Sequence, residues 1–281
     1  SEYYLFTASG LRKLAVPLKS TPTGLLAGRV LLSLDQDWKI NRSTFPQGSL
    51  VDFDLPSAIA DPVRLRPALV YAPGPRASLE SALVTKNALL LVTYENVRAH
   101  AFIYKPLRTG WKRERLDLPE LASVDPVATS VRSDDFFLSV RGFLTPTTLY
   151  EGNAASGSLA KVKTLPPQFD ASNDVVEQYE ATSKDGTKIP YFIVHPKNML
   201  LDGSNPTVLN AYGGFEISST PFYSGTVGKL WLERGGVFVL ANIRGGGEFG
   251  PAWHEAGIKT HRQRVFDDFY AVGEDLVARK I

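Results

Sequence analysis

The sequence predicts an all-β region followed by an α/β region. Up to about residue 170, short β-branched and aromatic runs are separated by Gly, Pro, Asp and Asn, which is typical of antiparallel strands joined by turns. From Val175 the chain changes to continuous apolar strands that alternate with helical patterns, as in a sheet covered by helices. Pro166-Pro167 disfavours regular structure just before this change. We therefore expect two domains, at residues 1–172 and 173–281.

The first region contains strand-like runs throughout. The clearest are residues 3–6, 29–34, 88–94 and 136–140. In residues 51–55, apolar and acidic side chains alternate, so we expect one face on a core and the other in water. Strand groups recur at a spacing compatible with propeller blades of roughly 40 to 50 residues. Because a β-sandwich gives similar runs, periodicity favours neither architecture.

The second region begins with a predicted hairpin. Its strands are residues 178–183 and 189–195, and Asp185-Gly186 suits the tight turn between them. Residues 206–212 and 236–242 are continuously apolar, which is typical of strands covered on both faces. This order of strands predicts the start of an α/β domain.

Two helices are predicted in the same region. One covers residues 227–234, and the other covers residues 265–280. Helical spacing in the second places five apolar residues on one face: Val265, Phe269, Val272, Leu276 and Val277. Asp267-Asp268 lies near its start, where carboxylates favour the positive end of the helix dipole, so we expect a capping role.

Composition excludes several classes of protein. The 31 basic and 29 acidic residues give a net charge of +2 without a basic stripe, so neither nucleic acid nor a membrane surface is an expected partner. No apolar stretch approaches the roughly 18 residues of a bilayer span, and no signal peptide is visible in this segment. The absence of cysteine excludes disulfides and thiolate chemistry. We expect a soluble protein, and the cytoplasm, the periplasm and secretion all remain open.

Tyr212-Gly213-Gly214-Phe215 is the first loop that could carry chemistry. It follows a predicted buried strand directly, and α/β-hydrolases place an oxyanion-hole donor in such a loop. The tyrosine hydroxyl can donate one hydrogen bond to a developing oxyanion. Taken alone, the loop is better explained as a tight turn with a packed tyrosine.

A second loop is rich in glycine and contains a formal G-x-G-x-x-G pattern at Gly245, Gly247 and Gly250. A dinucleotide site would need a helix to open at the third glycine, whereas the regular helical pattern comes only after Arg264. We therefore favour a structural role in which Arg244 pairs with Glu248 to hold a close-packed loop. Neither a cofactor nor a metal is expected, because the four histidines lack metal-ligand spacing.

The nucleophile motif of serine hydrolases is absent from these residues. No serine has glycine two positions before and two positions after it, so there is no G-x-S-x-G elbow. The sequence therefore contains no identifiable catalytic triad.

Several segments together resemble prolyl oligopeptidases in order and spacing. They are residues 183–195 (SKDGTKIPYFIVH), 211–215 (AYGGF), 241–250 (ANIRGGGEFG), 253–254 (WH) and 265–269 (VFDDF). Upstream segments also fit the family: 37–38 (DW), 48–50 (GSL), 143–146 (FLTP) and 169–170 (FD). The resemblance covers most continuously the residues from about Val175 to Ile281.

This resemblance implies a seven-bladed β-propeller capping an α/β-hydrolase domain, with short proline-containing peptides as substrates cleaved after proline through an acyl-enzyme. It implies that Tyr212 donates to the oxyanion and that Phe215 lines the pocket for the proline ring. The family's catalytic serine follows the position matching Ile281, and its Asp and His come later still. We therefore expect the C-terminal blades of a propeller, then an α/β-hydrolase domain truncated before the nucleophile elbow, with no peptidase activity in this chain alone.

Other possibilities remain open at this stage. A non-catalytic propeller scaffold could bind peptides without serine reactivity, and a dinucleotide-dependent oxidoreductase would rest only on the Gly245 run. A relative that prefers basic residues is also compatible with the sequence. Unpaired strand edges predict either self-association or association with the remainder of the protein.

Overall fold

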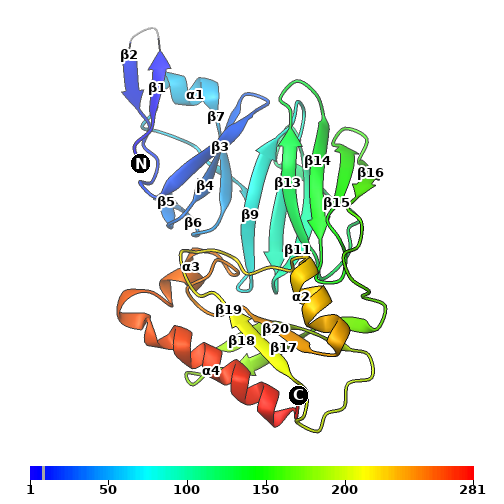
Figure 1. Ribbon diagram of the computed structural model, residues 1–281. Coiled ribbons are helices and arrows are strands. Elements are labelled where there is room, and N and C mark those ends of the chain that lie inside the picture. Colours follow the sequence, from blue (N-terminus) through cyan, green and yellow to red (C-terminus); the bar gives the residue numbers. More distant parts are fainter. Residues whose placement is uncertain (8–9) are drawn as a thin grey trace.

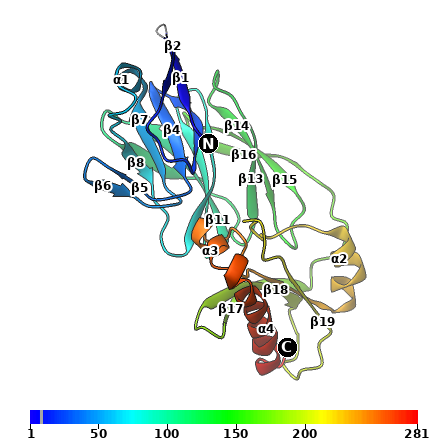
Figure 2. The same ribbon diagram turned by 90° about the vertical axis from the view of Figure 1, so that its left-hand side faces the viewer.

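The structure, a computed structural model, describes residues 1–7 and 10–281. Within these residues the fold is mostly β, with three antiparallel four-stranded sheets and one mixed four-stranded sheet that carries helices. Figure 1 shows the antiparallel sheets in the upper part of the view and the α/β segment below them, and Figure 2 shows the same division from the side. The predicted change from all-β to α/β structure is confirmed.

The three antiparallel sheets are propeller-like blades whose strands neighbour one another in chain order. The first contains β3 (Ser20–Leu26), β4 (Arg29–Leu34), β7 (Leu50–Asp54) and β8 (Ala68–Tyr71). The second contains β9 (Ala77–Val84), β10 (Leu89–Glu95), β11 (Arg98–Pro106) and β12 (Trp111–Arg115). The third contains β13 (Ser123–Thr129), β14 (Asp135–Arg141), β15 (Thr148–Asn153) and β16 (Ser158–Thr164). Smaller elements pack beside the first sheet: β1 (Tyr4–Thr7), β2 (Gly10–Lys13), β5 (Trp38–Ile40), β6 (Ser43–Phe45) and α1 (Leu55–Ala60).

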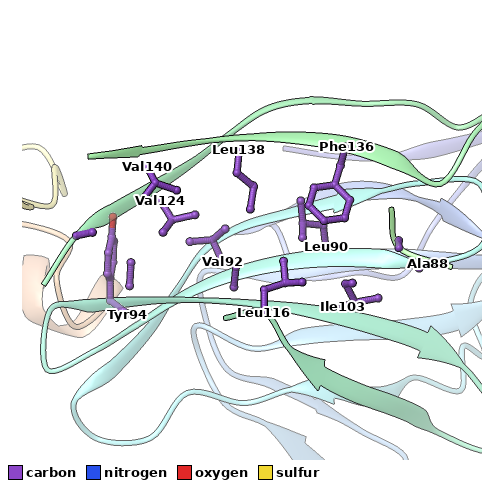
Figure 3. Packing of buried hydrophobic residues seen from close by; sticks show 14 residues of the cluster. Ala88, Leu90, Val92, Tyr94, Ile103, Leu116, Val124, Phe136, Leu138 and Val140 are labelled. Atoms are coloured by element: carbon purple, nitrogen blue, oxygen red, sulfur yellow. The ribbon is translucent and has the colours of Figure 1, made fainter. Parts of the chain in front are cut away.

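Strand β10 shows why the sheets stack. Successive side chains of a strand point to opposite faces. Leu89 and Leu91 belong to the core shared with the first sheet, whereas Leu90 and Val92 belong to the core shared with the third. Figure 3 shows Phe136 and Leu138 of β14 pointing toward the latter pair. The continuous apolar run in the sequence therefore reflects burial on both faces.

The α/β segment is built on the strand order β17-β18-β20-β19, in which only β19 and β20 are parallel. Its strands are β17 (Asp174–Thr182), β18 (Lys188–Pro196), β19 (Thr207–Ala211) and β20 (Val237–Ala241). Its helices are α2 (Gly225–Leu230), η1 (Leu232–Arg234), α3 (Pro251–Glu255), η2 (Lys259–His261) and α4 (Gln263–Ala278). The helix expected at residues 227–234 is thus a short α-helix followed by a 3₁₀ turn.

Each face of the mixed sheet has its own core. Helix α4 covers one face, where Val272 and Leu276 pack with Tyr191 and Val239. On the other face, Phe143 from the loop after β14 packs against Phe192 of β18, with ring centroids 5.6 Å apart. This second core joins the antiparallel sheets to the α/β segment.

Two side chains differ from the pattern expected of their elements. Asp52 was expected in water, but it is 2% exposed because it accepts hydrogen bonds from Arg29 (3.0 Å) and from Trp111 Nε1 (2.7 Å). Val277 was expected on the buried face of its helix, but it is 77% exposed. The apolar face of α4 is wider than the surface that the sheet covers.

Candidate functional site

The loop with Tyr212 and Phe215 begins directly after β19 and is exposed. Tyr212 is 48% exposed and Phe215 is 83% exposed, so both side chains are accessible from solvent. Phe215 and Glu216 have φ of 54° and 57°, in the left-handed region that residues with a Cβ adopt rarely. Such strain persists only where the surroundings enforce it, and it clusters at functional sites.

The glycine-rich loop after β20 packs against this exposed loop. A Cβ at Gly213 would lie 2.6 Å from the carbonyl oxygen of Arg244, and a Cβ at Gly245 would lie 2.7 Å from that of Gly213. A Cβ at Gly247 would lie 2.3 Å from the Glu216 carbonyl oxygen. Glycine is therefore required at these positions because two backbones approach each other closely.

The close packing of these two loops argues against a dinucleotide site at the G-x-G-x-x-G pattern. Contrary to expectation, a helix does begin directly after Gly250, because α3 starts at Pro251. That helix has only five residues. The backbone around Gly213 fills the space at Gly245 that a pyrophosphate would need. The glycines serve contact between loops.

Hydrogen bonds to its backbone attach the exposed loop to the α/β segment. The Glu216 N–H donates to the Gly245 carbonyl (3.2 Å), and Arg262 donates to the Gly213 carbonyl. At Ser219 the N–H donates to Glu248 Oε1 (2.9 Å), and the carbonyl accepts from Asn242 Nδ2 (2.5 Å). Both backbone groups of Ser219 are thus held by fully buried side chains.

Arg244 does not pair with Glu248, so that expectation was wrong. Its guanidinium donates to Asp268 (2.6 Å), which is fully buried, and to Asp185 (2.5 Å) in the hairpin turn. The hydrogen bonds from Arg244 hold the pKa of Asp185 well below its ordinary value. Asp268 is likewise not a helix cap, because α4 begins at Gln263 and the Asp268 carboxylate accepts from Arg244 instead. The network ties the glycine-rich loop to the hairpin and to α4.

A cavity of about 780 Å³ lies between these loops and the antiparallel sheets. Asp35 and Glu80 line it from the sheets, and Glu216 lines it from the exposed loop. Burial raises the pKa of both Glu80 and Glu216. Tyr212 and Phe215 are not among its lining residues, although the neighbouring Glu216 is.

Sequence reasoning singled out Tyr212 and Phe215, whose roles stay a prediction, and it missed the residues that support their loop. Glu248, Asn242 and His254 contact it, and no sequence motif marks these contacts because they join segments far apart in the chain. In the described ranges, no group of three or more His, Cys, Asp or Glu side chains is arranged to hold a metal. Nor does any helix there have the length and apolar character needed to cross a bilayer.

Comparison with known proteins points to one family. A profile described as "Prolyl oligopeptidase family" matches residues 223–281. A curated peptidase of Sinorhizobium fredii, y4nA, is 45% identical over 96% of this chain and 38% of its own length. The prolyl endopeptidase of Elizabethkingia meningoseptica is 44% identical over 50% of this chain and 20% of its own length.

A solved structure is similar over almost the whole chain. The post-proline cleaving enzyme from Rickettsia typhi is 33% identical, with a TM-score of 0.88 over 99% of this chain and 41% of its own. The chain therefore spans about two-fifths of the length of the Sinorhizobium and Rickettsia relatives.

Proposed function

Because this chain belongs to the prolyl oligopeptidase family, we propose that the whole protein is a serine peptidase that cleaves short peptides after proline through an acyl-enzyme. The prolyl endopeptidase and the post-proline cleaving enzyme among its relatives support this substrate class. In this proposal the serine, acid and base lie outside these 281 residues. The chain by itself then has no peptidase activity, because the triad acts as a unit.

The same proposal assigns the architecture. The three antiparallel sheets are the C-terminal blades of a β-propeller, and residues 173–281 begin an α/β-hydrolase domain. Contacts of β9 with both β3 and β13 support the first part, since the first strands of successive blades meet around a central axis. The gap between the end of β16 at Thr164 and the start of β17 at Asp174 supports the boundary.

The observation that carries the function is the loop after β19. Tyr212 donates its hydroxyl to the oxyanion, and Phe215 contacts the proline ring. Both side chains are accessible, and the left-handed backbone of Phe215 aims an 83% exposed ring away from the core. Donors placed in advance at a developing oxyanion need no reorganisation during the reaction, which is why such a loop must be rigid.

A fluorophosphonate probe tests this proposal on the full-length protein. We expect covalent labelling of one serine and hydrolysis of a chromogenic peptide after proline, with both lost when that serine is replaced by alanine. A full-length protein that remains unlabelled, yet binds proline-containing peptides, would instead be a non-catalytic scaffold. Hydrolysis after arginine or lysine alone would contradict the proline specificity.

A further inference from the structure

His254 of α3 contacts the two loops of the candidate site at the point where they meet. Its Nδ1 lies 2.7 Å from the carbonyl oxygen of Gly245 and 3.0 Å from the backbone nitrogen of Glu216. The Glu216 N–H is also 3.2 Å from the same Gly245 carbonyl. One imidazole nitrogen therefore faces both a hydrogen-bond acceptor and a hydrogen-bond donor.

A proton on Nδ1 suits the shorter of these two contacts. If Nδ1 lacked a proton, its lone pair would face the Gly245 carbonyl oxygen at 2.7 Å, which is repulsive. With a proton on Nδ1, the ring donates to the Gly245 carbonyl, and the Glu216 N–H, which only an unprotonated Nδ1 could accept, donates to the second lone pair of the same oxygen at 3.2 Å.

The contact lies at the two left-handed residues of the exposed loop. Phe215 and Glu216 are consecutive non-glycine residues in the left-handed region, and the Glu216 N–H is the first backbone donor after the exposed Phe215 ring. The neighbouring Trp253 packs on Phe249, with ring centroids 4.8 Å apart, whereas His254 reaches the loop through hydrogen bonds. The imidazole acts on the loop through hydrogen bonding.

We propose that His254 is a positioning residue for peptide cleavage: by donating from Nδ1 to the Gly245 carbonyl, it holds the Glu216 backbone and so sets the placement of Tyr212 and Phe215. This inference rests on the proposed function for its effect on catalysis. The placement of the loop itself is independent of that function, and it can be measured without substrate.

The test compares three variants of the full-length protein. His254→Ala removes the donor, His254→Asn places an amide nitrogen where Nδ1 was, and His261→Ala removes an exposed histidine from the same region as a matched control. We expect His254→Ala to lower kcat/KM for a proline peptide by about 10- to 100-fold, since small displacements of positioned groups have effects of this size. His254→Asn should recover most of the activity, and His261→Ala should match the parent.

Hydrogen exchange of the Glu216 and Ile217 amides supplies a second measurement that needs no catalysis. We expect faster exchange in His254→Ala and near-parental exchange in His254→Asn. If the parent proves inactive, the proposed function fails, and the exchange data still decide the role of His254. Unchanged exchange and activity in His254→Ala, or a loss of thermal stability that His254→Asn does not restore, would overturn the inference.

Discussion

Glu248 is a fully buried side chain whose two carboxyl oxygens have different surroundings. Oε1 accepts from the Ser219 N–H, whereas Oε2 has no hydrogen-bond partner among the residues that the structure describes. Burial raises the pKa of Glu248 to about 7, and the hydrogen bond from Ser219 opposes this only in part. A buried carboxyl oxygen without a hydrogen-bond partner favours the protonated carboxyl group.

We predict that Glu248→Gln removes a pH dependence of stability. Folding raises the pKa of Glu248, so the protonated carboxyl group contributes to the stability of the folded state. This contribution is fully present below pH 4.5, the ordinary pKa of the group, and is lost as pH rises through about 7. The neutral amide of glutamine does not ionise, so its stability does not fall in this way. The free energy of unfolding of the variant should therefore exceed that of the parent by roughly 3 kcal/mol at pH 8 and by little at pH 4. Thermal unfolding at the two pH values measures this, with the exposed Glu151→Gln as control. An equal difference at both pH values would contradict the assignment.

Tyr212→Phe tests the hydroxyl without changing the ring. If the hydroxyl binds the oxyanion only in the transition state, kcat for a proline peptide should fall by about 100-fold or more while KM changes little. Steady-state kinetics on the full-length protein measure both constants. Tyr270→Phe, which alters a 61% exposed tyrosine on α4, is the matched control. A rise in KM at unchanged kcat would assign Tyr212 to substrate binding instead.

At the residue scale, the sequence located side chains whose position follows from one element. Tyr212 and Phe215 could be placed because they come directly after a predicted strand, although β19 is partly exposed and is not covered on both faces as expected. The partner of Arg244 could not be predicted, because Glu248 is four residues away but Asp268 is brought to it by the packing of α4. Proximity in sequence is a poor guide to pairing in a loop that folds against other segments.

At the scale of elements, Arg244 joins the glycine-rich loop to the hairpin and to α4. The guanidinium is 4% exposed, and both of its carboxylate partners come from other elements. Removing one charge from a buried pair leaves the other uncompensated, which typically costs 3–5 kcal/mol.

We predict that Asp268→Asn destabilises the full-length protein by about 3 kcal/mol. Asp267→Asn is the control, because among the described residues the Asp267 carboxylate accepts from Gln263 alone, on the same helix (3.1 Å), and its loss should cost less than about 0.5 kcal/mol. Urea denaturation followed by fluorescence measures the difference. Equal effects of the two variants would show that Arg244 is held mainly by Asp185.

Element boundaries could be predicted well where apolar runs are long. The run expected at residues 29–34 is β4 with the same bounds, and that at 88–94 is β10 shifted by one residue. The outward face of β7 could not be predicted, because Asp52 is buried by Arg29 and by Trp111 from the next sheet. Alternation shows which residues share a face, but a neighbouring sheet decides whether that face meets water.

On the scale of the whole molecule, β19 lies at the end of its sheet with one side unpaired among the described strands. Val208 in this strand is 40% exposed. An open edge with apolar side chains is a template for pairing with another chain. We therefore predict that the 281-residue polypeptide, produced alone, self-associates.

Val208→Lys should shift that material toward monomer, because a charge on an edge strand opposes edge-to-edge pairing. Light scattering after size exclusion measures the change. Leu230→Lys, at a 56% exposed position on α2, is the control and should leave association unaltered. A monodisperse monomer in the unsubstituted polypeptide would show that the prediction is wrong.

Because β10 is buried on both faces, it couples the unfolding of the two neighbouring sheets. Leu89 and Leu91 bind it to one neighbouring sheet, and Leu90 and Val92 bind it to the other. In an array of this kind stability is close to a sum over adjacent units, and opening spreads inward from the ends. The backbone amides of β10 should consequently exchange with solvent among the slowest of the antiparallel region. A destabilising substitution in either neighbouring sheet should also speed hydrogen exchange in the sheet on the opposite side of β10.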